Sequence, residues 1–140
     1  MLKNISPILS PELLKILMEM GHGDELVIGD GNFPAASHAQ RLIRADGHGV
    51  PELLDAILKL FPLDTYVDCP AAVMDNGDSA NPPAIWATYK QVIESNEGDK
   101  AIAQVERFAF YERAKEAYAV VATGETAIYA NIILKKGVVV

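Results

Sequence analysis

The apolar positions at the start of the chain follow first a helical and then a strand-like spacing. Leucines and methionines recur at helical intervals over residues 13–20. They follow Ser10, Pro11 and Glu12, and a capping serine, a proline and an acid in this order are typical of a helix start. The apolar run at 26–28 has the character of a buried strand. The pattern therefore predicts a helix that ends near Gly21 and a buried strand after it.

The same alternation continues to the end of the chain. Apolar spacing and turn residues predict further strands at 41–46, 65–74, 102–106, 118–123 and 127–134, and helices at 50–61, 85–93 and 108–117. Strands that alternate with helices indicate an α/β fold, here a single-domain layered sandwich with a mixed sheet flanked by helices. The turn at Gly124 and Glu125 predicts that the last two strands close as an antiparallel C-terminal hairpin.

Composition narrows the class of protein. With 140 residues, 50% of them hydrophobic and 22% charged, the chain fits one globular domain over 1–140. A net charge of -7 without a cluster of Lys and Arg argues against nucleic acid as a partner. Cys69 is the only cysteine, and no apolar run approaches the length of a membrane span. We therefore expect a soluble, cytoplasmic protein without a membrane partner.

His22 and Asp30 are the first candidates for acid/base chemistry, because they flank the predicted buried strand at its two ends. Imidazole exchanges protons near neutral pH, and active sites of open α/β sheets lie in loops at strand ends. A histidine that ends a helix and an aspartate in a turn are the plain alternatives. An extended stretch of eight residues spans about 26 Å. The two side chains can share a site only if the flanking glycines fold the ends together or a neighbouring subunit contributes one of them.

Three further residues are candidates for binding. Arg107 directly follows a predicted strand, where a guanidinium can hold hydroxyl or carboxylate oxygens. Tyr129 and Asn131 are two positions apart in the last predicted strand and would share one face, which suits a carbohydrate but also an ordinary strand pair. The three histidines show no H-x-x-x-H spacing, and the Gly-x-Gly segments lack a Gly-Lys-Ser/Thr, so we expect neither a metal nor a nucleotide.

Several segments together carry a family resemblance. They are SPELL at 10–14, MGHGDE at 20–25, IRADG at 43–47, RFAFYERA at 107–114 and YANIILKKGV at 129–138. Over nearly its whole length the chain resembles the L-fucose mutarotase and D-ribose pyranase family. The string at 107–114 is more similar to the fucose branch, which implies L-fucose as the substrate. Gly31 and Asn32 depart from the family pattern, in which a histidine usually precedes Phe-Pro.

The resemblance implies a role for each candidate. His22 would be the proton donor, and the sugar contacts would be Asp30, Arg107, Tyr129, Ala130 and Asn131. It also implies ring-shaped homo-oligomers, commonly decamers, with sites near subunit contacts. Sugar anomers already interconvert slowly in water, so general acid/base catalysis suffices and we expect no cofactor. The expected reaction is the interconversion of the α and β anomers of L-fucose by general acid/base ring opening, catalysed by His22 and Asp30. A D-ribose pyranase and a non-catalytic monosaccharide-binding protein are the alternatives.

Overall fold

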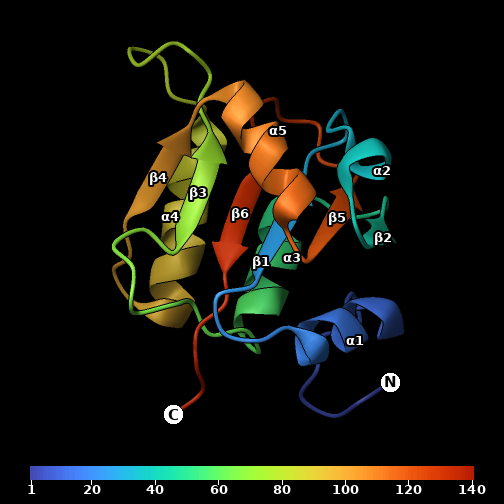
Figure 1. Cartoon of the computed structure of the whole chain (residues 1–140). Helices are drawn as coiled ribbons and strands as arrows, with labels where there is room; N and C mark the ends of the chain where they lie inside the picture. The colour runs from blue at the N-terminus through green and yellow to red at the C-terminus, as the bar shows by residue number, and fades with distance from the viewer.

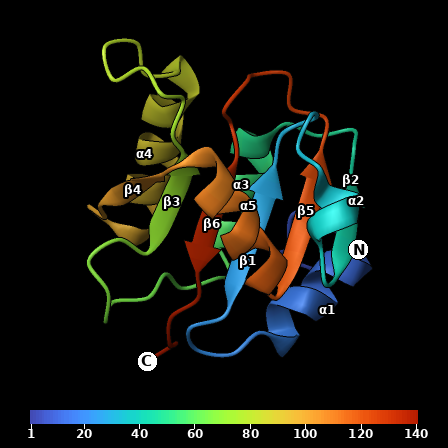
Figure 2. The ribbon, with the colours of Figure 1, turned by 45° about the horizontal axis from the view of Figure 1, so that its top comes forward.

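A six-stranded mixed sheet forms the centre of the computed structural model, which describes residues 1–140 (Figure 1). The strands are β1 (Glu25–Gly29), β2 (Leu42–Ala45), β3 (Ala71–Met74), β4 (Ile102–Val105), β5 (Ala119–Thr123) and β6 (Ile132–Lys135). Their order across the sheet is β2-β5-β1-β6-β3-β4 (Figure 2). Strand β6 runs antiparallel to both of its neighbours, β1 and β3, whereas the other pairs are parallel.

Five helices cover the two faces of this sheet. They are α1 (Pro11–Glu19), α2 (Ala35–His38), α3 (Val50–Leu58), α4 (Ala84–Glu97) and α5 (Arg107–Glu116). Leu26 and Ile28 of β1 pack in the larger core cluster with α1, α3 and α4, while Val27 points to the opposite face and packs in the second cluster with α2 and α5. Because both faces of β1 are covered, its residues 26–28 are all apolar and do not alternate with polar ones. No helix has the length and apolar composition needed to cross a bilayer.

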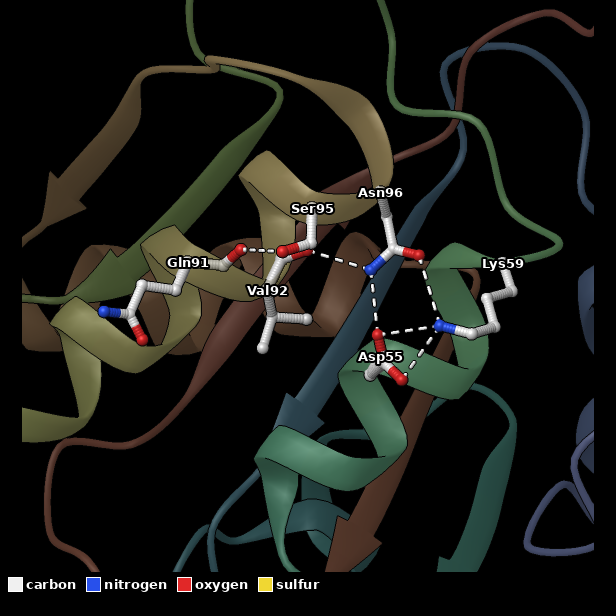
Figure 3. A network of polar contacts seen from close by, with 6 residues as sticks. All are labelled: Asp55, Lys59, Gln91, Val92, Ser95 and Asn96. Atoms are coloured by element: carbon white, nitrogen blue, oxygen red, sulfur yellow. Dashed lines mark hydrogen bonds and ion pairs between the residues drawn. The ribbon is translucent and has the colours of Figure 1, made fainter.

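Helices α3 and α4 lie on the face of the sheet opposite α5, and a small polar network joins them (Figure 3). The Asn96 side-chain amide donates to Asp55 Oδ1 at 2.9 Å and to the carbonyl of Val92 at 2.9 Å. Lys59 Nζ donates to both carboxylate oxygens of Asp55, at 2.9 and 3.0 Å. Hydrogen bonds from Asn96 and then from Lys59 lower the pKa of Asp55. The network holds α4 against α3, and α4 in turn reaches the candidate site.

The predicted mixed sheet with flanking helices is confirmed, but the predicted C-terminal hairpin is wrong. Strands β5 and β6 do not pair, because β1 lies between them: Leu26 is opposite Ala119 of β5 on one side and Leu134 of β6 on the other. A buried strand with both edges available takes a neighbour on each side, and the segment 124–131 is long enough to cross over it.

Some predicted boundaries also change. The last strand begins at Ile132 and not at 127, because Tyr129 has a left-handed backbone with φ 53° and interrupts the extended chain. Only β3 forms within the predicted strand region 65–74, and Pro70 lies directly before it. Helix α2 was not predicted; it is a single turn that follows Pro34.

Candidate functional site

A cavity of about 160 Å³ lies where the chain leaves β1 and enters β6. Four of the predicted site residues line it: Asp30, Arg107, Tyr129 and Asn131. Asn32, Phe33, Met74, Tyr111 and Ile128 complete the wall. Four separate segments of the sequence, 30–33, Met74, 107–111 and 128–131, therefore meet at this edge of the sheet, and the end-of-strand argument predicts such a meeting.

Asp30 is held in place by backbone and side-chain hydrogen bonds on all sides. Its backbone N–H donates to Asn131 Oδ1 at 2.8 Å. Its two carboxylate oxygens accept from the backbone N–H groups of Asn32, at 3.0 Å, and Ala130, at 3.3 Å. Both contacts use the carboxylate as an acceptor, and an ionised carboxylate can only accept hydrogen bonds. The carboxylate is thus held in a fixed orientation at the cavity wall by these hydrogen bonds, although only 6% of the residue is exposed.

Close backbone packing explains the glycine before Asp30. A Cβ atom on Gly29 would lie 2.7 Å from Cβ of Phe33, because the chain turns back sharply after β1. The carbonyl of Gly29 accepts a hydrogen bond from Thr123 Oγ1 at 2.7 Å, and the N–H of Gly31 donates to the carbonyl of Glu125 at 2.8 Å. The loop that carries Asp30 is therefore anchored to the end of β5.

The turn at Tyr129 and Ala130 is strained and is held by helix α4. Tyr129 has φ 53°, a conformation that costs about 1 kcal/mol for a residue with a side chain. Its carbonyl accepts from Trp86 Nε1 at 2.9 Å, and the carbonyl of Ala130 accepts from the Tyr89 hydroxyl at 2.6 Å. Burial, together with the negative charges of Glu125 and Asp30, raises the pKa of Tyr89, so this hydroxyl stays a donor. Ala130 itself is fully buried, and its hydrogen bonds to Tyr89 and Asp30 are made by its backbone carbonyl and N–H.

Arg107 is the first residue of α5 and lies at the exposed side of the cavity. Glu106 caps this helix, since its carboxylate accepts from the N–H groups of Phe108, at 3.0 Å, and Ala109, at 2.9 Å. These two bonds lower the pKa of Glu106. The neighbouring Tyr111 hydroxyl raises the pKa of Arg107, which keeps the guanidinium charged. The cap therefore fixes the start of a helix that presents a cation to the cavity.

His22 does not reach this cavity. It precedes β1, whereas Asp30 follows β1, so the strand separates the two residues. His22 Nε2 lies 3.0 Å from Oδ1 of Asp64, and its ring centroid is 5.2 Å from that of Tyr66. The structure thus brings together Asp30, Arg107 and the Tyr129 turn, and it leaves the predicted proton donor at the other end of the strand.

Comparison with known proteins assigns this arrangement to a family. The model described as "RbsD / FucU transport protein family" matches residues 3–139. The chain belongs to the RbsD/FucU family.

Its relatives in the RbsD/FucU family match along the full length. The fucose mutarotase of Homo sapiens is 54% identical over 144 residues, which cover 98% of this chain and 94% of that protein. The L-fucose mutarotase of Histophilus somni (strain 2336) is 55% identical over 141 residues, or 99% and 97% of the two chains. A crystal structure of the Streptococcus pneumoniae fucose mutarotase in complex with L-fucose has a TM-score of 0.95 and 58% identity, and covers 99% of this chain and 100% of that one.

Two residues were not predicted from the sequence: Tyr111, which lines the cavity, and Asp64, which contacts His22. Tyr111 lies within the family motif at 107–114, but its helical position gave no reason to separate it from the residues of a solvated helix face. Asp64 is 42 residues from His22, and no local pattern marks it. A periodicity argument cannot find such a pair, because the contact depends on how two loops pack and not on spacing along one element.

Proposed function

We propose that this member of the RbsD/FucU family is an L-fucose mutarotase, which interconverts the α and β anomers of L-fucose without a cofactor. The observation that carries the proposal is full-length identity of more than half to proteins named fucose mutarotase. The TM-score of 0.95 with a structure that holds L-fucose supports the same assignment. Bacillus subtilis RbsD, solved with D-ribose, is 23% identical and supports the fold alone.

The reaction needs two proton transfers. Ring opening removes the proton of the anomeric hydroxyl and places one on the ring oxygen, while the bond between the anomeric carbon and the ring oxygen breaks. The open aldehyde rotates and closes again on its other face. In this proposal Asp30 accepts the hydroxyl proton and His22 donates to the ring oxygen, with the roles exchanged on closure. Arg107, Tyr129, Asn131 and the backbone of Ala130 hold the remaining oxygens.

We further propose that His22 comes from a second copy of the chain. It cannot reach Asp30 within one chain, since β1 lies between them. Apolar or aromatic side chains are exposed near both half-sites: Phe108 and Ile128 beside the cavity, and Tyr66, 78% exposed, beside His22. Such groups are often covered in an assembly. A repeated contact between two different surfaces forms a ring when its rotation closes, which agrees with the ring-shaped decamer that the family resemblance implies. The free thiol of Cys69 suits a cytoplasmic setting.

Anomer exchange measured by saturation-transfer NMR tests the activity. We expect the wild-type protein to accelerate L-fucose exchange over buffer, and His22→Ala and Asp30→Asn each to lose about 10²- to 10⁴-fold. His48→Ala is the matched control, because His48 also pairs with a carboxylate but lies away from the cavity. The same measurement with D-ribose tests the pyranase alternative. A wild-type rate equal to buffer overturns the proposal and leaves a protein that binds sugar without catalysis. An accelerated rate that is unchanged in His22→Ala overturns the role of His22 in the reaction.

Complementation tests the shared site. His22→Ala and Asp30→Asn are each expected to be inactive alone. When the two variants are co-expressed and purified as one assembly, a site that combines the intact His22 of one copy with the intact Asp30 of another recovers exchange. A mixed assembly that stays as inactive as its parts overturns the shared site, but not the activity of the wild-type protein.

A further inference from the structure

Asp64 is a buried carboxylate that the cavity does not account for. The buried polar residues of the chain are Asp30, Asp64, Thr123 and Asn131. Three of these form or anchor the cavity wall, whereas Asp64, 3% exposed, lies beside His22 at the other end of β1. Burial of a carboxylate is costly unless hydrogen bonds compensate for lost water. A role at this position must therefore be sought in the groups that Asp64 contacts.

The fold brings His22 and Asp64 together across the end of β6. On one side of Lys136, the N–H of Gly23 donates to the Lys136 carbonyl at 2.8 Å. On the other side, Leu63 forms a bridge with Lys136, and the N–H of Asp64 donates to the carbonyl of Lys135 at 3.0 Å. The loop before β1 and the loop before β3 thus flank the same extended segment.

Backbone packing allows little movement of the Asp64 loop. A Cβ atom on Gly137 would lie 2.8 Å from Cα of Asp64, so only glycine allows this close approach. The N–H of Gly137 donates to the carbonyl of Pro62 at 2.8 Å, just before the loop. Asp64 is therefore anchored by its own N–H and by the chain packed against it, which is the environment that a fixed orienting group needs.

The hydrogen bonds of the carboxylate define the tautomer of His22. Asp64 Oδ1 accepts from the backbone N–H of Tyr66 at 3.1 Å and lies 3.0 Å from His22 Nε2. The bond from Tyr66, followed by that from His22, lowers the pKa of Asp64. An ionised carboxylate has no proton to donate, so Nε2 must carry the hydrogen. The lone pair of neutral His22 is then on Nδ1, and 44% of this side chain is exposed.

We infer that Asp64 is the positioning residue for His22, and that Nδ1 of His22 is the atom that exchanges a proton with the sugar. This inference rests on the proposed function. In one direction Nδ1 takes a proton and forms an imidazolium, whose charge the adjacent carboxylate stabilises. In the other direction the Nδ1–H bond breaks and the proton passes to the ring oxygen. Asp64 itself touches neither the sugar nor the moving proton, and it acts by fixing the ring and its charge.

Two substitutions separate the geometry of Asp64 from its charge. Asp64→Asn keeps an oxygen that can accept from both Tyr66 and His22 but has no negative charge. Asp64→Ala removes the acceptor as well. We expect the maximal L-fucose exchange rate to fall about 10-fold in the first variant, and in the second to approach the about 10²- to 10⁴-fold loss of His22→Ala. The half-saturating L-fucose concentration should stay unchanged in both, because no sugar contact is lost.

A spectroscopic measurement reads the tautomer directly. ¹⁵N NMR of the imidazoles, with the His22 signal assigned from its absence in His22→Ala, should show the Nε2–H form in the wild type and a mixture in Asp64→Ala. Glu52→Gln is the matched control, since Glu52 lies 3.4 Å from His48 in an exposed pair. It should leave exchange and the His22 signal unchanged.

The possible failures are distinguishable. A wild-type protein without exchange above buffer overturns the proposed function. An Nδ1–H tautomer in the wild type, or Asp64→Ala with full exchange while His22→Ala is inactive, overturns the inference alone. Thermal unfolding and the assembly size of each variant show whether it is folded. If Asp64→Ala does not fold, the exchange rate of Asp64→Asn tests the inference instead. An exchange rate in Asp64→Asn equal to that of the wild type counts against the inference.

Discussion

Asn131 Oδ1 accepts a hydrogen bond from the backbone N–H of Asp30 at 2.8 Å, across 101 positions of sequence. Both residues are buried, and both line the cavity. The side-chain amide of Asn131 also approaches Met74 Sδ at 3.8 Å. The bond joins the end of β1 to the start of β6, so Asn131 both lines the site and orients the carboxylate beside it.

Asn131→Ala should therefore lower stability and activity together. The substitution leaves the buried N–H of Asp30 without an acceptor, which costs about 1–3 kcal/mol of unfolding free energy. It also frees the Asp30 loop, so L-fucose exchange should fall. Urea unfolding and NMR exchange measure the two effects. Asn81→Ala is the control, because Asn81 is exposed in a loop and bonds only locally. If Asn131→Ala and Asn81→Ala had the same unfolding free energy and the same exchange rate, Asn131 would not orient the Asp30 loop.

The sequence was sufficient to predict the parts of the site that depend on strand ends. Asp30 follows an apolar run, and Arg107 follows another predicted strand; both positions fall at the same edge of the sheet. Tyr129 and Asn131 also line the cavity, but not as alternate residues of one strand. Their placement depends on a left-handed turn, which the apolar pattern does not encode.

The parts that the sequence did not predict depend on contacts between distant segments. The order of strands places β1 between β5 and β6, although a turn signal joins the last two. The pairing of His22 with Asp64 depends on two loops that meet at Lys136. Neither can be derived from local spacing, since each depends on which edges of the sheet remain open when the chain collapses.

Tyr129→Gly should be more stable than Tyr129→Ala. Both variants lose the ring from the cavity, so both should bind L-fucose more weakly. Only glycine adopts φ 53° without steric cost, and this should favour Tyr129→Gly by about 0.5–1 kcal/mol in spite of its more flexible unfolded chain. Chemical unfolding compares the two variants directly. If alanine were the more stable, as in ordinary extended backbone, the strain assigned to this turn would be absent.

Tyr89→Phe should weaken the support of the turn from helix α4. The lost hydroxyl leaves the buried carbonyl of Ala130 without its donor, at a cost of about 1–2 kcal/mol. Because burial raises the pKa of Tyr89, its stabilising effect is complete below the unfolded tyrosine value, about 10, and decreases at higher pH. The difference from wild type should thus be constant at neutral pH and shrink above about pH 10. Tyr118→Phe is the control for the size of the loss at neutral pH, since its hydroxyl bonds to the exposed side chain of Glu19.

Asn96→Ala should lower stability in a pH-dependent way through the network of Figure 3. The amide bond to Asp55 lowers the pKa of this carboxyl group, so its contribution is complete above the unfolded value of about 3.9 and is lost as the pH falls through the lower folded value. Asp55 is 46% exposed at its side chain, so solvent screening limits the loss at neutral pH to about 0.5–1.5 kcal/mol.

Urea unfolding of wild type and Asn96→Ala at about pH 7 and about pH 3 measures this dependence. The difference between them should shrink at the lower pH, where protonated Asp55 no longer gains from the amide. Ser95→Ala is the matched control on the same helix, since its hydroxyl bonds only to the carbonyl of Gln91 at 2.9 Å, and its effect should not depend on pH. A difference for Asn96→Ala that is the same at both pH values would mean that the amide stabilises the helix contact by packing alone, without the charge of Asp55.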